Sequence, residues 1–312
     1  MADAALTGVA ARLLRAAGLL LVLSLAGCAW LVDKQHALAL RPTPGQPAGF
    51  VGLRPGDERR LVPVNGSDGT QQLSLWWLPN ADPAAPTLLY LHGTFRNLYQ
   101  NLPKMEALRE AGFSIVAVDY RGWGDSTPIV PSEATIVADA RRAWDDLAMR
   151  QPDPRKRVIY GHSLGGTVAV MVASELRCGS QYGALALEST FTSLPDVAAA
   201  AGFWGRVGAL LTTMEFDAGS RIGAVDAPVW MLHGGRDRTV PVELGRQLRD
   251  AAGPGVHWVE FPDGTHSRLH SQFPEQYRQA FHELIGQLSP GRCRTATCNA
   301  GAPAAASRGS AD

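Results

Sequence analysis

Short apolar runs alternate with helix-like segments through the middle of the chain. Seven runs rich in β-branched and aliphatic residues have the length of buried strands. They are 73–78, 87–92, 115–119, 157–161, 184–188, 229–233 and 256–261. Between them, five segments with helical patterns span 102–111, 131–149, 165–176, 242–252 and 274–288. Strands that alternate with helices of this length predict a mostly parallel sheet covered by helices on both faces. Active sites in such sheets lie beyond the carboxyl ends of the strands.

The beginning of the chain has the layout of an exported lipoprotein. Two arginines precede an apolar run over 16–25, which is too short for an ordinary transmembrane helix and leads into Leu-Ala-Gly-Cys at 25–28. This ending resembles the bacterial lipobox. It implies that residues 1–27 are a signal peptide and that Cys28 is lipidated, which anchors the protein on the extracytoplasmic side of a bacterial membrane. An uncleaved signal anchor is the alternative, because apolar residues resume at 29–32.

The flanks of the helix and strand pattern differ in composition from its centre. Residues 28–60 are rich in Pro, Gly and Arg and are expected to be a lipidated N-terminus and tether. The catalytic domain is expected over 61–289, followed by a disordered tail over 290–312 that is rich in Ala, Gly and Ser. One large domain is therefore predicted.

Composition and cysteine count narrow the function. The 312 residues are 46% hydrophobic, which indicates a globular core, and 29 Lys+Arg balance 29 Asp+Glu. Without a positive surplus, a nucleic-acid partner is not expected. Outside the cytosol Cys293 and Cys298 can close a local disulfide, while Cys178 is expected to be a small buried hydrophobic residue. The sequence contains no recognisable metal site, P-loop or dinucleotide fingerprint, so no cofactor is expected.

The strongest chemical signal is Gly-His-Ser-Leu-Gly-Gly at 161–166. This segment follows a predicted strand and opens a predicted helix. A strand-to-helix turn that exposes a serine oxygen needs strained backbone, and flanking glycines remove side chains that would clash there. The pattern predicts that Ser163 is a nucleophile. A serine that only caps the helix would explain Ser163 but not both glycines.

A serine hydroxyl needs a base, and that base needs an orienting acid. His266 follows the last predicted strand in a Gly-Thr-His loop, and Asp237 follows the strand 229–233. The order Ser163, Asp237, His266 is that of the α/β-hydrolase triad. Glu188, at the end of an earlier strand, is the rival for the acid.

Six segments together carry a family resemblance. They are Leu-His-Gly-Thr at 91–94, Asp-Tyr-Arg-Gly-Trp-Gly-Asp-Ser at 119–126, the serine turn, Glu-Ser-Thr-Phe-Thr-Ser at 188–193, the Asp237 loop and Gly-Thr-His at 264–266. With these segments in this order, residues 61 to 288 resemble an α/β-hydrolase of the compact branch that includes small esterases, palmitoyl-thioesterases and monoacylglycerol lipases. The resemblance implies the α/β-hydrolase fold and an oxyanion hole formed by the backbone N–H groups of Leu164 and Thr94.

The resemblance implies hydrolysis of a small-molecule carboxylic ester or thioester through an acyl-enzyme. A serine aminopeptidase shares these motifs but usually has a larger cap, and a non-catalytic binding module would have no need for all three of Ser163, Asp237 and His266. The segment 191–224 is the only room for a cap. Its apolar residues suggest a small helical lid, an acyl-chain wall, or the core face of an amphipathic helix. They are Phe203, Trp204, Val207, Leu210, Leu211, Met214 and Phe216.

Overall fold

The computed structural model describes residues 27–28, 30–66, 69–288 and 293–294. Its chain contacts define two units, residues 1–41 and residues 42–312. In the first unit, residues 30–40 form a helix. The proposed signal sequence at 1–26 lies outside the described residues. No helix in the described part of the chain is both long and apolar enough to cross a membrane.

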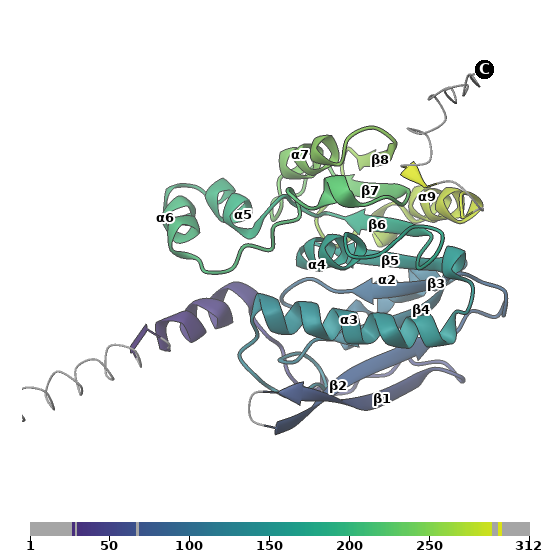
Figure 1. Ribbon diagram of the computed structural model, residues 1–312, viewed down its shortest axis with the longest axis horizontal. Coiled ribbons are helices and arrows are strands. Elements are labelled where there is room, and N and C mark those ends of the chain that lie inside the picture. Colours follow the sequence, from purple (N-terminus) through teal and green to yellow (C-terminus); the bar gives the residue numbers. More distant parts are fainter. Residues whose placement is uncertain (1–26, 29, 67–68, 289–292, 295–312) are drawn as a thin grey trace, which may run out of the picture. The chain divides into compact units, whose positions relative to one another are not determined.

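The second unit is built on an eight-stranded sheet with the order β1-β2-β4-β3-β5-β6-β7-β8 (Figure 1). β1 pairs with β2 and β2 pairs with β4 in antiparallel register, and every later pair is parallel. The strands are β1 Glu58–Gly66, β2 Gly69–Leu78, β3 Thr87–Leu91, β4 Ser114–Asp119, β5 Arg157–His162, β6 Ala184–Glu188, β7 Val229–Gly234 and β8 Val256–Phe261.

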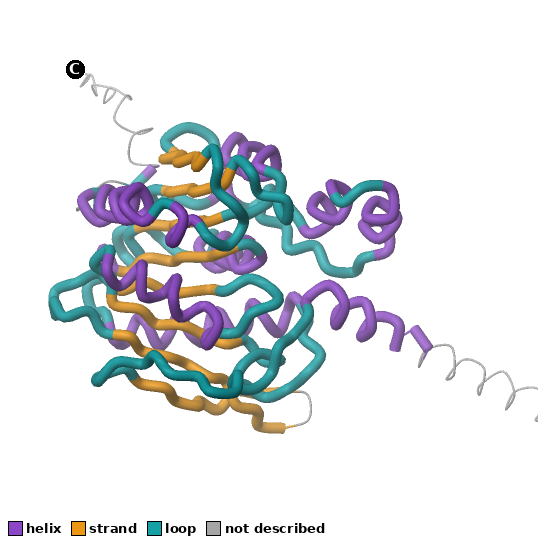
Figure 2. The backbone as a smooth tube through the Cα atoms, turned by 180° about the vertical axis from the view of Figure 1, so that it is seen from behind, coloured by secondary structure: helices purple, strands orange, loops and turns teal. Residues whose placement is uncertain are grey.

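Helices cover both faces of this sheet. α3 and α4 pack together on the face seen in Figure 1, and α2 and α9 pack together on the face seen in Figure 2. The helices are α2 Leu98–Glu110, α3 Glu133–Arg150, α4 Leu164–Ala173, α5 Leu194–Ala200, α6 Phe203–Leu211, α7 Val242–Ala252, α8 Leu269–Gln272 and α9 Pro274–Gly286, with short 3₁₀ turns at Pro154–Lys156 and Ile222–Ala224. A buried cluster that includes Trp76, Tyr90, Leu108 and Phe281 fills the space between the sheet and α2 and α9. The predicted α/β-hydrolase fold is confirmed.

All seven predicted strands and all five predicted helices are present, and β1 is an addition. β1 is an edge strand with a proline and two adjacent arginines, and among its described side chains only Val62 is buried. Its strand conformation comes from pairing with β2, because its own sequence has no apolar alternation that would predict a strand.

The prediction of an irregular tether over 28–60 is wrong, and so is the domain boundary at Leu61. The compact unit begins at Pro42. The Gly45 N–H donates to the Gly124 carbonyl at 2.6 Å, and the Phe50 ring lies 4.6 Å from the Tyr99 ring. Prolines prevent a helix over residues 42–55, but they allow an extended chain to lie along the domain surface and pack the partly buried ring of Phe50 against it.

The cysteine pairing also differs from the expectation. Cys178 forms a disulfide with Cys293, so the suggested Cys293–Cys298 bridge and the interpretation of Cys178 as a free buried residue are both wrong. The Arg294 N–H donates to the Asp226 carbonyl at 2.6 Å, which fixes the chain beside Cys178. Sequence spacing favoured a local pair, whereas the fold brings together two cysteines 115 residues apart. The remainder of the predicted tail, 295–312, lies outside the described residues.

The Cys178–Cys293 bridge is expected to stabilise the domain. Closing a loop of 115 residues restricts the unfolded chain, and native disulfides typically contribute about 2–4 kcal/mol. A Cys178→Ser/Cys293→Ser variant should therefore unfold at lower urea concentration than the wild type. Reduction of the wild type should give the same shift, and Cys298→Ser should give none. A Cys298→Ser variant as unstable as the double variant would contradict this pairing.

Candidate active site

The parallel strands bring the predicted catalytic residues to one edge of the sheet. Ser163 follows β5, Asp237 follows β7 and His266 follows β8, so all three occupy loops beyond the carboxyl ends of parallel strands. Thr94 lies in the loop after β3, which pairs with β5. This is the edge where open α/β sheets place their ligand sites.

Ser163 has the strained backbone that its motif predicts. It lies between β5 and α4 with φ 55° and ψ −124°, in a region that few residues other than glycine adopt. A Cβ atom at Gly161 would collide with the Gly165 backbone, and one at Gly165 would collide with the Leu91 backbone. The two glycines therefore permit the tight approach of β3, β5 and α4 that exposes the serine oxygen to the site.

A continuous hydrogen-bond chain joins the three residues. His266 Nε2 lies 3.0 Å from Ser163 Oγ, and His266 Nδ1 lies 2.7 Å from Asp237 Oδ2. The other oxygen of Asp237 accepts the N–H groups of Thr239 and Val240 at 2.9 and 2.8 Å. These bonds fix the carboxylate, which in turn orients the imidazole toward the serine.

The rival acid, Glu188, is held in a different network. Lys104 Nζ donates to one carboxylate oxygen, and the hydroxyls of Tyr160 and Tyr277 donate to the other at 2.6 and 2.9 Å. Burial alone would raise the pKa of Glu188, but the Lys104 charge and these hydrogen bonds bring the pKa below its ordinary value. Its carboxylate is thus occupied by partners other than His266.

His162 is a neighbour of the site that the sequence pattern alone did not single out. Its Nε2 lies 2.9 Å from the carbonyl oxygen of His266, so it supports the loop that carries the imidazole. Burial, followed by the charge of Lys104, lowers the pKa of His162 well below its usual value. A neutral ring can donate this bond through one nitrogen. His162 directly precedes Ser163 in the serine turn, and this position is the sequence feature that could have indicated its role. It puts the side chain against the loop that carries His266.

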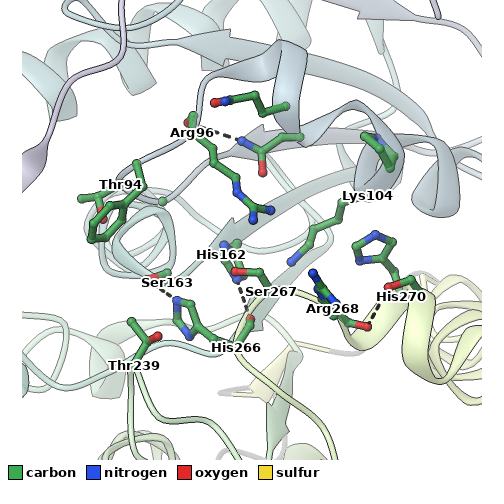
Figure 3. Close-up of a pocket in the computed structure, with 16 residues that line it drawn as sticks. Thr94, Arg96, Lys104, His162, Ser163, Thr239, His266, Ser267, Arg268 and His270 are labelled. Atoms are coloured by element: carbon green, nitrogen blue, oxygen red, sulfur yellow. Dashed lines mark hydrogen bonds between the residues drawn. The ribbon is translucent and has the colours of Figure 1, made fainter.

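A cavity of about 510 Å³ opens over Ser163 and His266 (Figure 3). Thr94 lies on its wall, and Leu164 is the first residue of α4, so the backbone N–H groups predicted for the oxyanion hole belong to the loop after β3 and to a helix N-terminus beside the serine. The described part of the chain contains no group of three or more His, Cys, Asp or Glu side chains that could hold a metal ion.

Two short helices form in the segment suggested as a cap, but they do not line the cavity as an acyl-chain wall would. α5 and α6 pack against each other, and the cavity lining includes no residue of 191–224. Trp204 and Leu210 on α6 are 80% and 86% exposed, which excludes core packing for this helix, whereas Met214 and Phe216 after it are buried. The apolar pattern of this segment correctly predicted a helix. It did not predict that the apolar side chains of α6 would be exposed.

A buried carboxyl group beside the cavity loops provides a pH-dependent test of the structure. Asp119 ends β4, its Oδ1 accepts the Leu98 N–H at 2.8 Å, and burial raises its pKa to about 8. Because the folded protein then retains a proton that the unfolded chain releases, this group lowers stability progressively as pH rises toward 8. His92 nearby has its pKa lowered to about 4, mainly by burial, so its ring stays uncharged in the folded protein near neutral pH.

Asp119→Asn removes the carboxyl group whose raised pKa makes the stability of the protein depend on pH. The free energy of unfolding of the variant, measured relative to the wild type, should increase by about 1 kcal/mol per pH unit between about pH 6 and pH 7.5. Urea denaturation of both proteins across that range measures the difference. A difference that stays constant with pH would show that Asp119 is ionised in the folded state.

The fold and this arrangement of residues define a hydrolase of the α/β-hydrolase type, and comparison with known proteins agrees. Residues 82–213 match the family model described as "Serine aminopeptidase, S33". The uncharacterized protein Rv2307c of Mycobacterium tuberculosis is 32% identical over 237 residues, which cover 75% of this chain and 81% of that protein. The chain therefore belongs to the same family as Rv2307c, and its fold is that of an α/β-hydrolase.

Two further similarities concern proteins whose names describe an activity. Lysophosphatidylserine lipase ABHD12 of Danio rerio is 32% identical over 193 residues, covering 57% of this chain but only 50% of that protein. The solved structure of the Pyrococcus furiosus esterase Pf2001 superposes with a TM-score of 0.62 at 20% identity, covering 80% of this chain and 98% of that one. At this identity the esterase structure supports the fold alone.

Proposed function

We propose that the protein is a serine hydrolase that cleaves carboxylic ester or thioester bonds through an acyl-enzyme intermediate. The observation that carries the proposal is the chain of contacts from Asp237 Oδ2 through His266 to Ser163 Oγ, at 2.7 and 3.0 Å. The similarity to a protein named as a lysophosphatidylserine lipase, 32% identical over 193 residues, supports the same chemistry.

The arrangement performs the reaction in two halves. His266 Nε2 accepts the Ser163 proton as the oxygen attacks the substrate carbonyl, and Asp237 stabilises the imidazolium that forms. Negative charge on the carbonyl oxygen is met by the N–H groups of Thr94 and Leu164. His266 then protonates the leaving alcohol or thiol, activates a water that attacks the acyl-serine, and returns the proton to Ser163.

A fluorophosphonate probe tests this proposal, because it labels activated serines. Wild type is expected to be labelled and to hydrolyse p-nitrophenyl esters, with the chain-length profile reporting pocket size. Ser163→Ala should lose both properties. Ser174→Ala changes a serine at the opposite end of α4 and should behave as wild type. Labelling that persists in Ser163→Ala would exclude this nucleophile, and a folded wild type that neither labels nor hydrolyses any ester would favour a non-catalytic binding module.

Peptidase activity is the second candidate, favoured by the description of the matched family model. A serine aminopeptidase must bind the positively charged amino group of its substrate. The described lining of the cavity contains no Asp or Glu side chain for that purpose, and the cap is limited to two short helices. Aminoacyl p-nitroanilides should therefore be hydrolysed far more slowly than p-nitrophenyl esters. Faster cleavage of the anilides would reverse this order.

We propose further that Cys28 is lipidated and holds the protein on the extracytoplasmic side of a bacterial membrane. The Leu-Ala-Gly-Cys sequence carries this proposal, and the Cys28 thiol is exposed and outside any disulfide. The Cys178–Cys293 bridge supports an oxidising compartment. Cells fed a labelled fatty acid should label the wild type but not Cys28→Ser, and label retained by Cys28→Ser would contradict lipidation at this residue.

A further inference from the structure

Positive side chains gather on the wall of the catalytic cavity. Arg96 lies in the loop between β3 and α2, Arg268 lies in the loop between His266 and α8, and Lys104 lies on α2. Figure 3 shows all three beside Ser163 and His266 on the cavity wall. As the described lining has no carboxylate, nothing negative on the wall offsets them.

The two arginines differ from most arginines of this domain. Buried Arg109 and Arg121 are paired with Asp57 and Asp139. Within the described ranges, by contrast, no carboxylate forms an ion pair with Arg96 or Arg268. Both side chains are exposed, so a ligand can reach them.

Lys104 contributes to the cavity in a different way from the two arginines. Its charge is balanced by buried Glu188 beneath the cavity, so it offers the cavity an N–H donor without adding net charge. His270 on the same wall is uncharged at neutral pH, because burial, and then Lys104, lowers its pKa to about 4. The net positive charge of the wall near neutral pH therefore comes from the arginines.

The remaining lining is mixed, with both polar and apolar side chains. Phe95 and Pro103 are its hydrophobic side chains, while Gln100, Asn101, Ser267 and Ser271 add amides and hydroxyls. The apolar part can contact a short acyl chain, while the charged and amide groups favour a ligand that also carries polar groups. Guanidinium groups match the planar or tetrahedral oxygens of a carboxylate or phosphate with paired hydrogen bonds.

We propose that the cavity selects esters that carry an anionic group, a phosphate or a carboxylate, which binds Arg96 and Arg268 while the ester carbonyl lies at Ser163. This inference rests on the proposed hydrolase function. Each arginine lies two residues from a proposed reaction partner, Arg96 from Thr94 and Arg268 from His266. The anion therefore sits close to the reacting ester and fixes its position on the enzyme.

Three hexanoyl esters of matched length test the selection: 1-hexanoylglycerol, which is neutral, 1-hexanoylglycerol-3-phosphate and 3-hexanoylglycerate. Their chains are short enough to stay monomeric, which avoids effects of micelles. Wild type should have a kcat/KM at least about ten-fold higher for one or both anionic esters than for the neutral ester, and the better of the two identifies the anion as phosphate or carboxylate. Equal values for all three would overturn the proposal.

Arg96→Gln and Arg268→Gln assign the effect to the cavity. Each should lower kcat/KM for the preferred anionic ester about ten-fold and change that for 1-hexanoylglycerol less than two-fold. Arg141→Gln removes an exposed, ion-paired arginine on α3 and should change neither. Equal loss toward the neutral and anionic esters would show that the two arginines only support the loops, which also overturns the proposal.

Binding to Ser163→Ala separates this inference from the proposed chemistry. Calorimetric titration of that variant with 1-hexanoylglycerol-3-phosphate and 3-hexanoylglycerate measures recognition without turnover. Binding that is weakened by adding Arg96→Gln supports the anion site even if Ser163 were not the nucleophile. Hydrolysis of neutral esters by wild type, together with no binding of either anionic ester, would overturn the anion site and leave the hydrolase function standing.

Discussion

His266→Gln is expected to lower kcat for ester hydrolysis by about 10⁴-fold or more, because it removes the group that transfers every proton in the reaction. The imidazole links Asp237 to the serine, with contacts of 2.7 and 3.0 Å on its two nitrogens. A glutamine can fill part of the space but cannot accept and return a proton at neutral pH.

Pre-steady-state and steady-state hydrolysis of a p-nitrophenyl ester measures this loss. His282→Gln alters an exposed histidine on α9 and should retain wild-type kcat. Combining Ser163→Ala with His266→Gln should be no worse than either change alone, because the residues act as a unit. Losses that multiply in the double variant would mean that His266 acts on something other than the Ser163 proton.

Asp237→Asn and Glu188→Gln are expected to fail in different ways. Asp237→Asn keeps the shape of the side chain but can present an N–H to His266 Nδ1, which favours the wrong tautomer, and a loss of about 10³ to 10⁴ in kcat is expected. Glu188→Gln removes the charge that balances buried Lys104. A buried ion pair that loses one partner costs about 3–5 kcal/mol, so this variant should be less stable.

Urea denaturation and kinetics on the same preparations distinguish the two effects. Asp237→Asn should unfold near the wild-type midpoint while being nearly inactive. Glu188→Gln should unfold earlier, with its folded fraction retaining kcat within about ten-fold of wild type. If Glu188→Gln abolished activity while Asp237→Asn spared it, the acid would be Glu188 and the hydrogen bond to Asp237 would be incidental.

The sequence predicted the parts of the fold that local pattern controls. Parallel strands buried on both faces read as continuous apolar runs, so the segments that became β3 to β7 were evident without a structure. The Gly-x-Ser-x-Gly turn was equally evident, because only glycine tolerates the close backbone contacts around Ser163. Strand order then placed Asp237 and His266 at the same edge.

Features that depend on distant segments were not predictable in this way. β1 is a strand because β2 offers it hydrogen bonds, and Cys178 meets Cys293 because the folded chain closes a loop of 115 residues. The sequence favoured Asp237 over Glu188, but the contacts of the two acids depend on the structure, in which Asp237 lies against His266 and Lys104 engages Glu188.

The positive charge of the cavity is another feature that the sequence alone did not predict. Arg96 and Arg268 occur among 29 Lys and Arg in a chain without net charge, and nothing in their local sequence distinguishes them. Their significance comes from lying with Ser163 on a cavity wall whose described lining contains no carboxylate. The sequence by itself predicted most of the elements and the candidate reacting residues, because burial and backbone strain act over a few neighbouring residues. Tertiary structure decided the pairing of β1 with β2, the disulfide pairing and the cavity's charge, because these depend on contacts between segments far apart in the chain.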